Sequence, residues 1–215
     1  MKRLKNFKIK IIFIKIISIL SFSATASVTT FTDRASFEAA SGQLISENFN
    51  SITAETSFRS SSLDLEDFSL SMSGSVSSNS QRNFIDVPPL SFPNFLNVDN
   101  TTQVDVLLNQ SSSLLFNFDI PIFEFGADFS NLQDDQYRTV INIAGETITP
   151  SIGDDGVRFL GFKSNAAFST VEFESVFEND GFAIDNLSYS AIPLPAGVWL
   201  FGSALVGLSV VRRRR

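Results

Sequence analysis

Alternation of apolar and polar residues is the feature of this chain that most constrains its fold, and it is clearest over residues 171–177 (Val-Glu-Phe-Glu-Ser-Val-Phe). A period of two places alternate side chains on opposite faces of a β-strand. Similar stretches recur at residues 113–118, 122–129, 137–143, 147–149, 157–163 and 182–190. Turn-forming sequences such as Ala144-Gly145 separate them. The pattern predicts an all-β fold, a single antiparallel β-sandwich.

The part of the chain before residue 100 is more mixed. Residues 32–40 begin with a Thr-Asp capping sequence, are rich in helix formers and stop before Gly42, so we expect one short N-terminal helix. Residues 46–50 follow as the expected first strand, and residues 68–72 as another. Three prolines within residues 87–93 predict a loop or a sheet edge, because proline cannot donate a ladder hydrogen bond.

The first 26 residues have the features of a secretory signal peptide. A basic start precedes an almost wholly apolar run at residues 11–22, and a small-x-small cleavage site follows at Ala24 and Ala26. Lys15 interrupts the run, and a membrane anchor is the alternative. The run is short for a span of about 30 Å, which favours the cleaved signal and export through the secretion translocon. We expect residues 27–190 to form the body domain.

The last 25 residues, 191–215, combine three features in a fixed order. They open on a proline motif made of Pro193, Leu194, Pro195 and Ala196. An apolar run at residues 196–211 follows, and the segment ends with Arg212, Arg213, Arg214 and Arg215. Positive flanks resist translocation, so these arginines predict a stop on the cytoplasmic side of the inner membrane, with the body outside. A plain transmembrane anchor is the alternative, although 16 residues are fewer than the roughly 20 usually needed.

Charge and missing residue types exclude several functions. Residues 27–191 hold six of the 16 basic residues and all 23 acidic ones, a net charge of −17. We therefore expect no nucleic acid as a partner, because phosphates would meet a repulsive field. The chain has neither cysteine nor histidine. Thiol nucleophiles, Ser-His-Asp triads and His-ligated zinc are excluded, and catalysis would have to depend on carboxylates and hydroxyls.

The tail resembles the PEP-CTERM sorting signals of Gram-negative bacteria, in the variant whose consensus begins Val-Pro-Leu-Pro-Ala. The resemblance covers residues 192–215 and includes the Pro-Leu-Pro-Ala core, the Trp199-Leu-Phe-Gly-Ser203 run and the terminal arginines, with Ile192 in place of valine. It implies that the partner is an exosortase, a membrane-embedded enzyme thought to cut such tails near the prolines. The Leu194-Pro-Ala-Gly197 run is also similar to Gram-positive sortase motifs, but it lacks their threonine. The resemblance implies a protein displayed on the cell surface or held in an exopolysaccharide matrix.

The body also resembles domains that accompany such tails, in residues 31–40, 159–162 and 181–189. The last segment resembles the closing strand of jelly-roll carbohydrate-binding modules. That resemblance implies a jelly-roll-like sandwich and a structural calcium at Asp185, with Glu47 and Asn50 as first-strand ligands. Calcium takes six to eight oxygen ligands, which such side chains can supply. The alternative role for Asp185 is that of a capping or turn residue.

Three functional classes follow for the body: a structural or matrix protein, a carbohydrate-binding module, and a carboxylate-dependent glycoside hydrolase. Sugars usually stack on tryptophan or tyrosine, and outside the tail the chain offers only Tyr137 and Tyr189. No acidic motif marks a catalytic pair, although 23 acids provide pairs by chance. We therefore expect a non-catalytic body, with no cofactor indicated apart from calcium.

Overall fold

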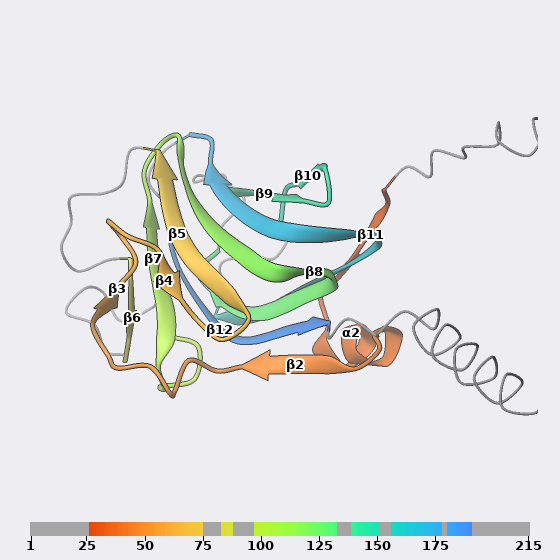
Figure 1. Ribbon diagram of the computed structural model, residues 1–215, viewed down its shortest axis with the longest axis horizontal. Coiled ribbons are helices and arrows are strands. Elements are labelled where there is room, and N and C mark those ends of the chain that lie inside the picture. The colour runs from red at the N-terminus through yellow and green to blue at the C-terminus, as the bar shows by residue number, and fades with distance from the viewer. Residues whose placement is uncertain are drawn as a thin grey trace, which may run out of the picture.

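The computed structural model of the protein describes residues 26–74, 83–87, 97–132, 139–150, 156–177 and 180–190. These residues form an all-β, antiparallel, sandwich-like body with one short helix (Figure 1). The helix is α2 (Arg34–Ala40). The shorter strands are β1 (Val28–Phe31), β2 (Leu44–Glu47), β3 (Thr56–Ser57), β4 (Leu63–Asp64), β5 (Phe68–Gly74), β6 (Phe84–Asp86), β7 (Gln103–Leu108), β9 (Thr139–Ile143) and β10 (Glu146–Ile148). The longest are β8 (Ser112–Ser130), β11 (Val157–Ser175) and β12 (Asp180–Ser190).

Two long strands, β8 and β11, belong to both layers of the body. The first part of β8 pairs with β5 and with the end of β11, which in turn pairs with β9. The second part of β8 pairs with the start of β11 and with β12, which continues the sheet to β7, β6 and β3. Figure 1 shows both strands curving across the molecule between these two sets of partners.

The curvature coincides with breaks in strand pairing. The register between β8 and β11 shifts on both sides of Phe168, which pairs with Ile122, and residues 118–121 of β8 lie at the second shift. Inward positions on β8 change from even to odd numbers beyond Ile122, from Phe116 and Phe118 to Phe125 and Phe129, all of them buried. A proline supplies no ladder hydrogen bond, so Pro121 suits the bend. The sequence pattern predicted one strand before and another after each break. The structure instead has a single continuous bent strand in both places, β8 and β11.

Phenylalanine fills the space between the layers. Phe173 lies within 6.2 Å, centroid to centroid, of the rings of Phe116, Phe125, Phe129 and Phe182. Burying one such side chain contributes about 1.5–3 kcal/mol. The core therefore accounts for most of the aromatic content of the body.

The first part of the chain differs from the expectation in its strands. The expected first strand at residues 46–50 is wrong in its bounds and its position, because β2 ends at Glu47 and β1 precedes it. Residues 48–50 leave the strand, and Phe49 adopts a left-handed φ of 56°. The expected short helix is confirmed as α2, with Asp33 as its cap: the Ser36 amide donates to the Asp33 side chain at 2.8 Å.

No helix among the described residues has the length and apolarity needed to cross a membrane. Residues 1–25 and 191–215 lie outside the described residues, so the predicted signal peptide and sorting tail fall there. Residue 88 onward in the expected proline loop lies outside them as well.

Candidate functional site

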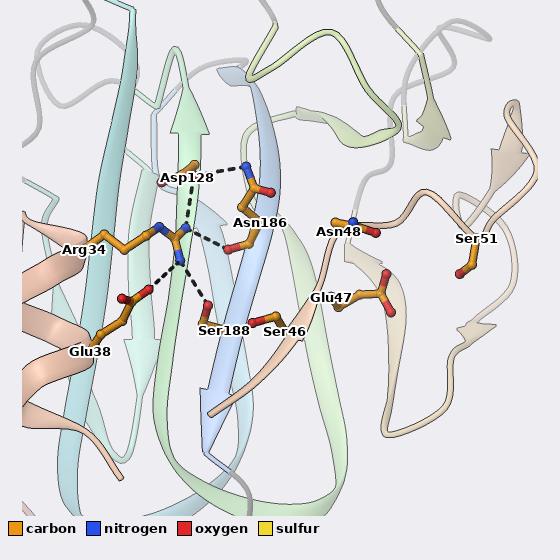
Figure 2. Close-up of a pocket in the computed structure, with 9 residues that line it drawn as sticks. All are labelled: Arg34, Glu38, Ser46, Glu47, Asn48, Ser51, Asp128, Asn186 and Ser188. Carbon is orange, nitrogen blue, oxygen red and sulfur yellow. Dashed lines mark hydrogen bonds and ion pairs between the residues drawn. The ribbon is translucent and has the colours of Figure 1, made fainter. Parts of the chain in front are cut away.

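A polar pocket lies between helix α2 and the outer face of the sheet, and we call it the α2 pocket. Its volume is about 530 Å³. The described residues that line it are Arg34, Glu38, Ser46, Glu47, Asn48, Ser51, Asp128, Asn186 and Ser188. Figure 2 shows that they come from α2, from β2 and the segment after it, and from β8 and β12, with Arg34, Glu38, Asp128, Asn186 and Ser188 gathered around the guanidinium.

Glycines in the sheet allow α2 to pack close to it. Gly161 on β11 and Gly126 on β8 are register partners, and Ser188 and Ser46 continue the same row across β12 and β2. A Cβ atom on Gly161 would lie 2.8 Å from the Phe37 ring and 2.9 Å from the Phe159 ring. The two glycines therefore provide the space that Phe37 occupies.

Arg34 connects α2 to two strands at the base of the pocket. Its guanidinium donates to the Asn186 carbonyl oxygen at 2.8 Å and to Ser188 Oγ at 3.0 Å. An ion pair to Asp128 Oδ2 measures 3.1 Å, and the guanidinium carbon lies 4.6 Å from the centroid of the Phe159 ring. Planar arginine groups suit such combined pairing and stacking. This side chain fixes the position of the helix and the base of the pocket together.

A second cation secures the other end of the helix. Lys163 Nζ donates to the Ala40 carbonyl oxygen and pairs with Glu124 Oε1 at 3.2 Å. A cation at a helix C-terminus complements the exposed carbonyl groups there. Basic side chains of the sheet and helix thus hold both ends of α2 in place.

Asn186 joins the pocket to an acidic cluster beside it. The residue has a φ of 50° and lies where the pairing of β12 with β8 shifts register. Its side-chain amide donates to Asp128 Oδ2 at 3.2 Å and to Asp99 Oδ2 at 3.5 Å. One amide therefore separates two carboxylates that belong to different segments of the chain.

Asp185 is fully buried next to this amide. Its Oδ1 accepts from the Asn186 backbone at 2.6 Å, and its Oδ2 accepts from Thr101 Oγ1 at 3.3 Å. Burial raises the pKa of Asp185 to about 7, and the charge of Asp99 acts in the same direction. Burial alone would also raise the pKa of Asp99, but hydrogen bonds from Thr101 and Asn186 outweigh it and lower that pKa.

The three predicted calcium ligands occupy different surroundings. Asn50 is near the Asp185 cluster, because its Oδ1 accepts from the Thr102 amide at 3.1 Å and Thr101 donates to Asp185. Glu47 lines the α2 pocket, and its Oε1 accepts from the Phe49 amide at 2.5 Å. Within the described part of the chain, no three acidic side chains are grouped so that they could hold a metal ion. Calcium binding therefore stays a prediction.

Other predicted residues fall in the core or beyond the described part. Tyr189 is 4% exposed and its ring lies 5.1 Å from that of Phe118, so it offers no platform for a sugar. Tyr137, Ala24 and the whole sorting motif lie outside the described residues. Ala26, the second residue of the expected cleavage site, begins the described part and is half-buried.

Sequence reasoning did not single out the pocket. It did single out residues 31–40, 159–162 and 181–189, and the structure brings these three segments together around Arg34. The sequence therefore marked the three segments separately. That they meet at one place follows only from the pairing of β8 with β11 and with β12.

The chain matches no known protein-family model, and no curated protein matches it.

Proposed function

We propose that this protein is exported and sorted through a C-terminal exosortase signal to the cell surface or to an exopolysaccharide matrix. The observation that carries the proposal is the order of the Pro193-Leu-Pro-Ala196 motif, the apolar run and the four terminal arginines. An inner-membrane precursor, delivered by the translocon, would be cut near the prolines. Prolines suit recognition by an enzyme, because they keep the chain extended and remove backbone donors.

The body supports a non-catalytic role in this proposal. In finer terms we propose a jelly-roll-like sandwich, consistent with two antiparallel layers connected by long bent strands. The chain lacks histidine and cysteine, and Arg34, Asp128, Asn186 and Ser188 at the base of the pocket are paired with one another. A structural or polysaccharide-associated body fits these features better than a carboxylate-dependent hydrolase does.

Substitution of both tail prolines tests the sorting step. The double variant Pro193→Ala and Pro195→Ala keeps the apolar run and the arginines, so membrane insertion should persist while processing stops. The precursor should then accumulate in the inner membrane, as measured by fractionation and intact-mass spectrometry. The double variant Pro88→Ala and Pro89→Ala is the matched control and should be processed normally. A surface-exposed wild-type protein that still ends at Arg215 would refute sorting and leave a plain anchor.

A carbohydrate-binding module with a structural calcium is the second candidate. The observation that favours it is the buried Asp185 beside the exposed Asp99, both of which accept a hydrogen bond from Thr101, next to the Thr102 amide that Asn50 binds. Calcium at 100 times its dissociation constant would stabilise the folded state by about 2.7 kcal/mol. Thermal unfolding with calcium and with magnesium, at equal ionic strength, tests it. Asp185→Asn should abolish the calcium-specific shift, and equal shifts with both metals would indicate charge screening alone.

A further inference from the structure

We propose that the α2 pocket binds a short segment of a neutral polysaccharide. This inference rests on the proposed function, since it names the ligand class that a polysaccharide-associated body would hold. The binding site is the α2 pocket, which lies between α2, β2, β8 and β12.

The lining chemistry points to a ligand rich in hydroxyl groups. None of the described lining residues is apolar, and together they present serine hydroxyls, asparagine amides and carboxylates. A sugar hydroxyl both donates and accepts, so it can donate to a carboxylate and accept from an amide or a serine. A lipid or a flat aromatic ligand would need an apolar wall, which these residues do not provide.

The charge of the pocket favours a neutral ligand over an anionic one. Three carboxylates, those of Glu38, Glu47 and Asp128, line it together with one arginine. Arg34 is already engaged by Asp128, the Asn186 carbonyl and Ser188. A phosphate or a uronate would therefore meet net negative charge, in a body that is itself strongly acidic. Hydroxyl groups of a neutral sugar carry no such repulsion.

The base of the pocket is held in place while its rim stays accessible. Ser188 is buried, and Arg34, Asp128 and Asn186 are half-buried and hydrogen-bonded to one another (Figure 2). The exposed rim residues are Glu38, Ser46, Asn48 and Ser51. A base fixed before binding loses little conformational freedom when a ligand arrives.

The size of the pocket sets the length of chain that it can hold. Its volume of about 530 Å³ falls within the range of roughly 300–1,000 Å³ found for small-molecule sites. One or two sugar rings fit this space, and the rest of the polymer would continue into solvent. Without an aromatic platform, we expect a dissociation constant on the order of 1 mM for such a segment.

Titration calorimetry on the full chain tests the proposal, in a zwitterionic detergent whose headgroup is not a sugar. The probes are three neutral hexasaccharides (an α-glucan, a β-glucan and a β-mannan), with a galacturonate hexamer and a glucosamine hexamer as charged comparisons. Ser46→Leu places a larger apolar side chain on the pocket rim and should weaken binding of the neutral probe at least tenfold. Ser169→Leu, at an exposed serine of β11 outside the pocket, is the matched control and should bind like the wild type.

Asn48→Ala provides a second variant if Ser46→Leu fails to fold by circular dichroism, and we expect it to weaken binding several-fold. Binding of a neutral probe that is lost with the pocket variants and kept by Ser169→Leu supports the proposal. Absence of binding to all three neutral probes, tighter binding of either charged hexamer, or equal weakening by both leucine variants overturns it. Normal tail processing alongside absent binding would overturn only this inference and leave the sorting proposal standing.

Discussion

The two faces of the layer built from β8, β11 and β12 use the same strands for opposite purposes. On the inner face, Phe125, Phe162 and Phe182 are completely buried against the other layer. On the outer face, the alternate residues Gly126, Gly161 and Ser188 leave room for α2 and for the polar pocket. Packing on the inner face depends on large aromatic side chains. Packing on the outer face depends on small residues and on polar contacts.

The consequences of this difference concern stability and accessibility. Removing bulk from the inner face leaves a cavity that close-packed neighbours fill only in part. Adding bulk to the outer face displaces a helix of seven residues without entering the main core. The inner face should therefore control global unfolding, and the outer face the position of α2 and the form of the pocket.

The largest expected effect is on the inner face, at Phe173. Phe173→Ala should lower the free energy of unfolding by about 3–5 kcal/mol, because the ring packs among four other aromatic rings. Chemical denaturation measures the loss. Phe177→Ala, two residues beyond β11 and with a side chain 56% exposed, is the matched control and should cost less than about 1 kcal/mol. Equal losses in the two variants would show that the layers do not pack as described.

A smaller effect is expected on the outer face, at Gly161. Gly161→Ala places a methyl group within 3 Å of the Phe37 and Phe159 rings, so α2 must shift, at a cost of about 1–3 kcal/mol. Faster proteolysis within α2 should accompany the loss. Gly42→Ala is the matched control, because its Cβ would meet nothing within 4 Å. Phe37→Leu, which trims the obstructing ring, should recover part of the loss in the double variant.

The fold could be predicted from the sequence wherever the inner face dominates. Alternation marked β9 and the end of β11, in which every second residue is buried between the layers. It also marked β12, the start of β11 and both halves of β8, although consecutive residues are buried in much of these strands. It did not mark β7 (Gln103–Leu108), in which Gln103, Val104, Asp105 and Val106 alternate but Leu107 and Leu108 end the period after four residues. The two polar residues of this short pattern, Gln103 and Asp105, are themselves buried.

The candidate site could not be predicted, because its residues share no local pattern. Arg34 reaches Asn186 and Ser188 from more than 150 positions away in the sequence. The space for Phe37 depends on the pairing of Gly126 with Gly161, and hence on the register of two 19-residue strands. The Asp33 cap of α2 was predictable, since its hydrogen bond is local. Hydrogen bonds between residues close in the sequence can be predicted from the sequence alone. Contacts between distant segments can be predicted only when the fold is known.

The stability of the protein should depend on pH with opposite signs at Asp180, between the two layers, and at Asp33, the cap of α2. Asp180 is buried at the start of β12, where Thr139 Oγ1 of β9 donates to it across the layers. Burial raises the pKa of Asp180 to about 7, from a usual value of 3.8. The folded state therefore holds this proton more tightly than the unfolded state does. Its stabilising effect is complete below about pH 4 and is lost as the pH rises through about 7.

Asp33, on the solvent side of α2, should show the opposite sign. The hydrogen bonds from Ser36 lower the pKa of Asp33, so its contribution to stability is present above the usual pKa and is lost as the pH falls below it.

Asp180→Asn keeps an acceptor for Thr139 and should remove about 1.4 kcal/mol of the stability change between pH 6 and pH 8. Asp33→Asn should leave that interval unchanged and alter the profile only below about pH 4. Unfolding curves at half-unit pH steps measure both, and an unaltered slope in Asp180→Asn would mean that this carboxyl is ionised in the folded protein throughout that interval.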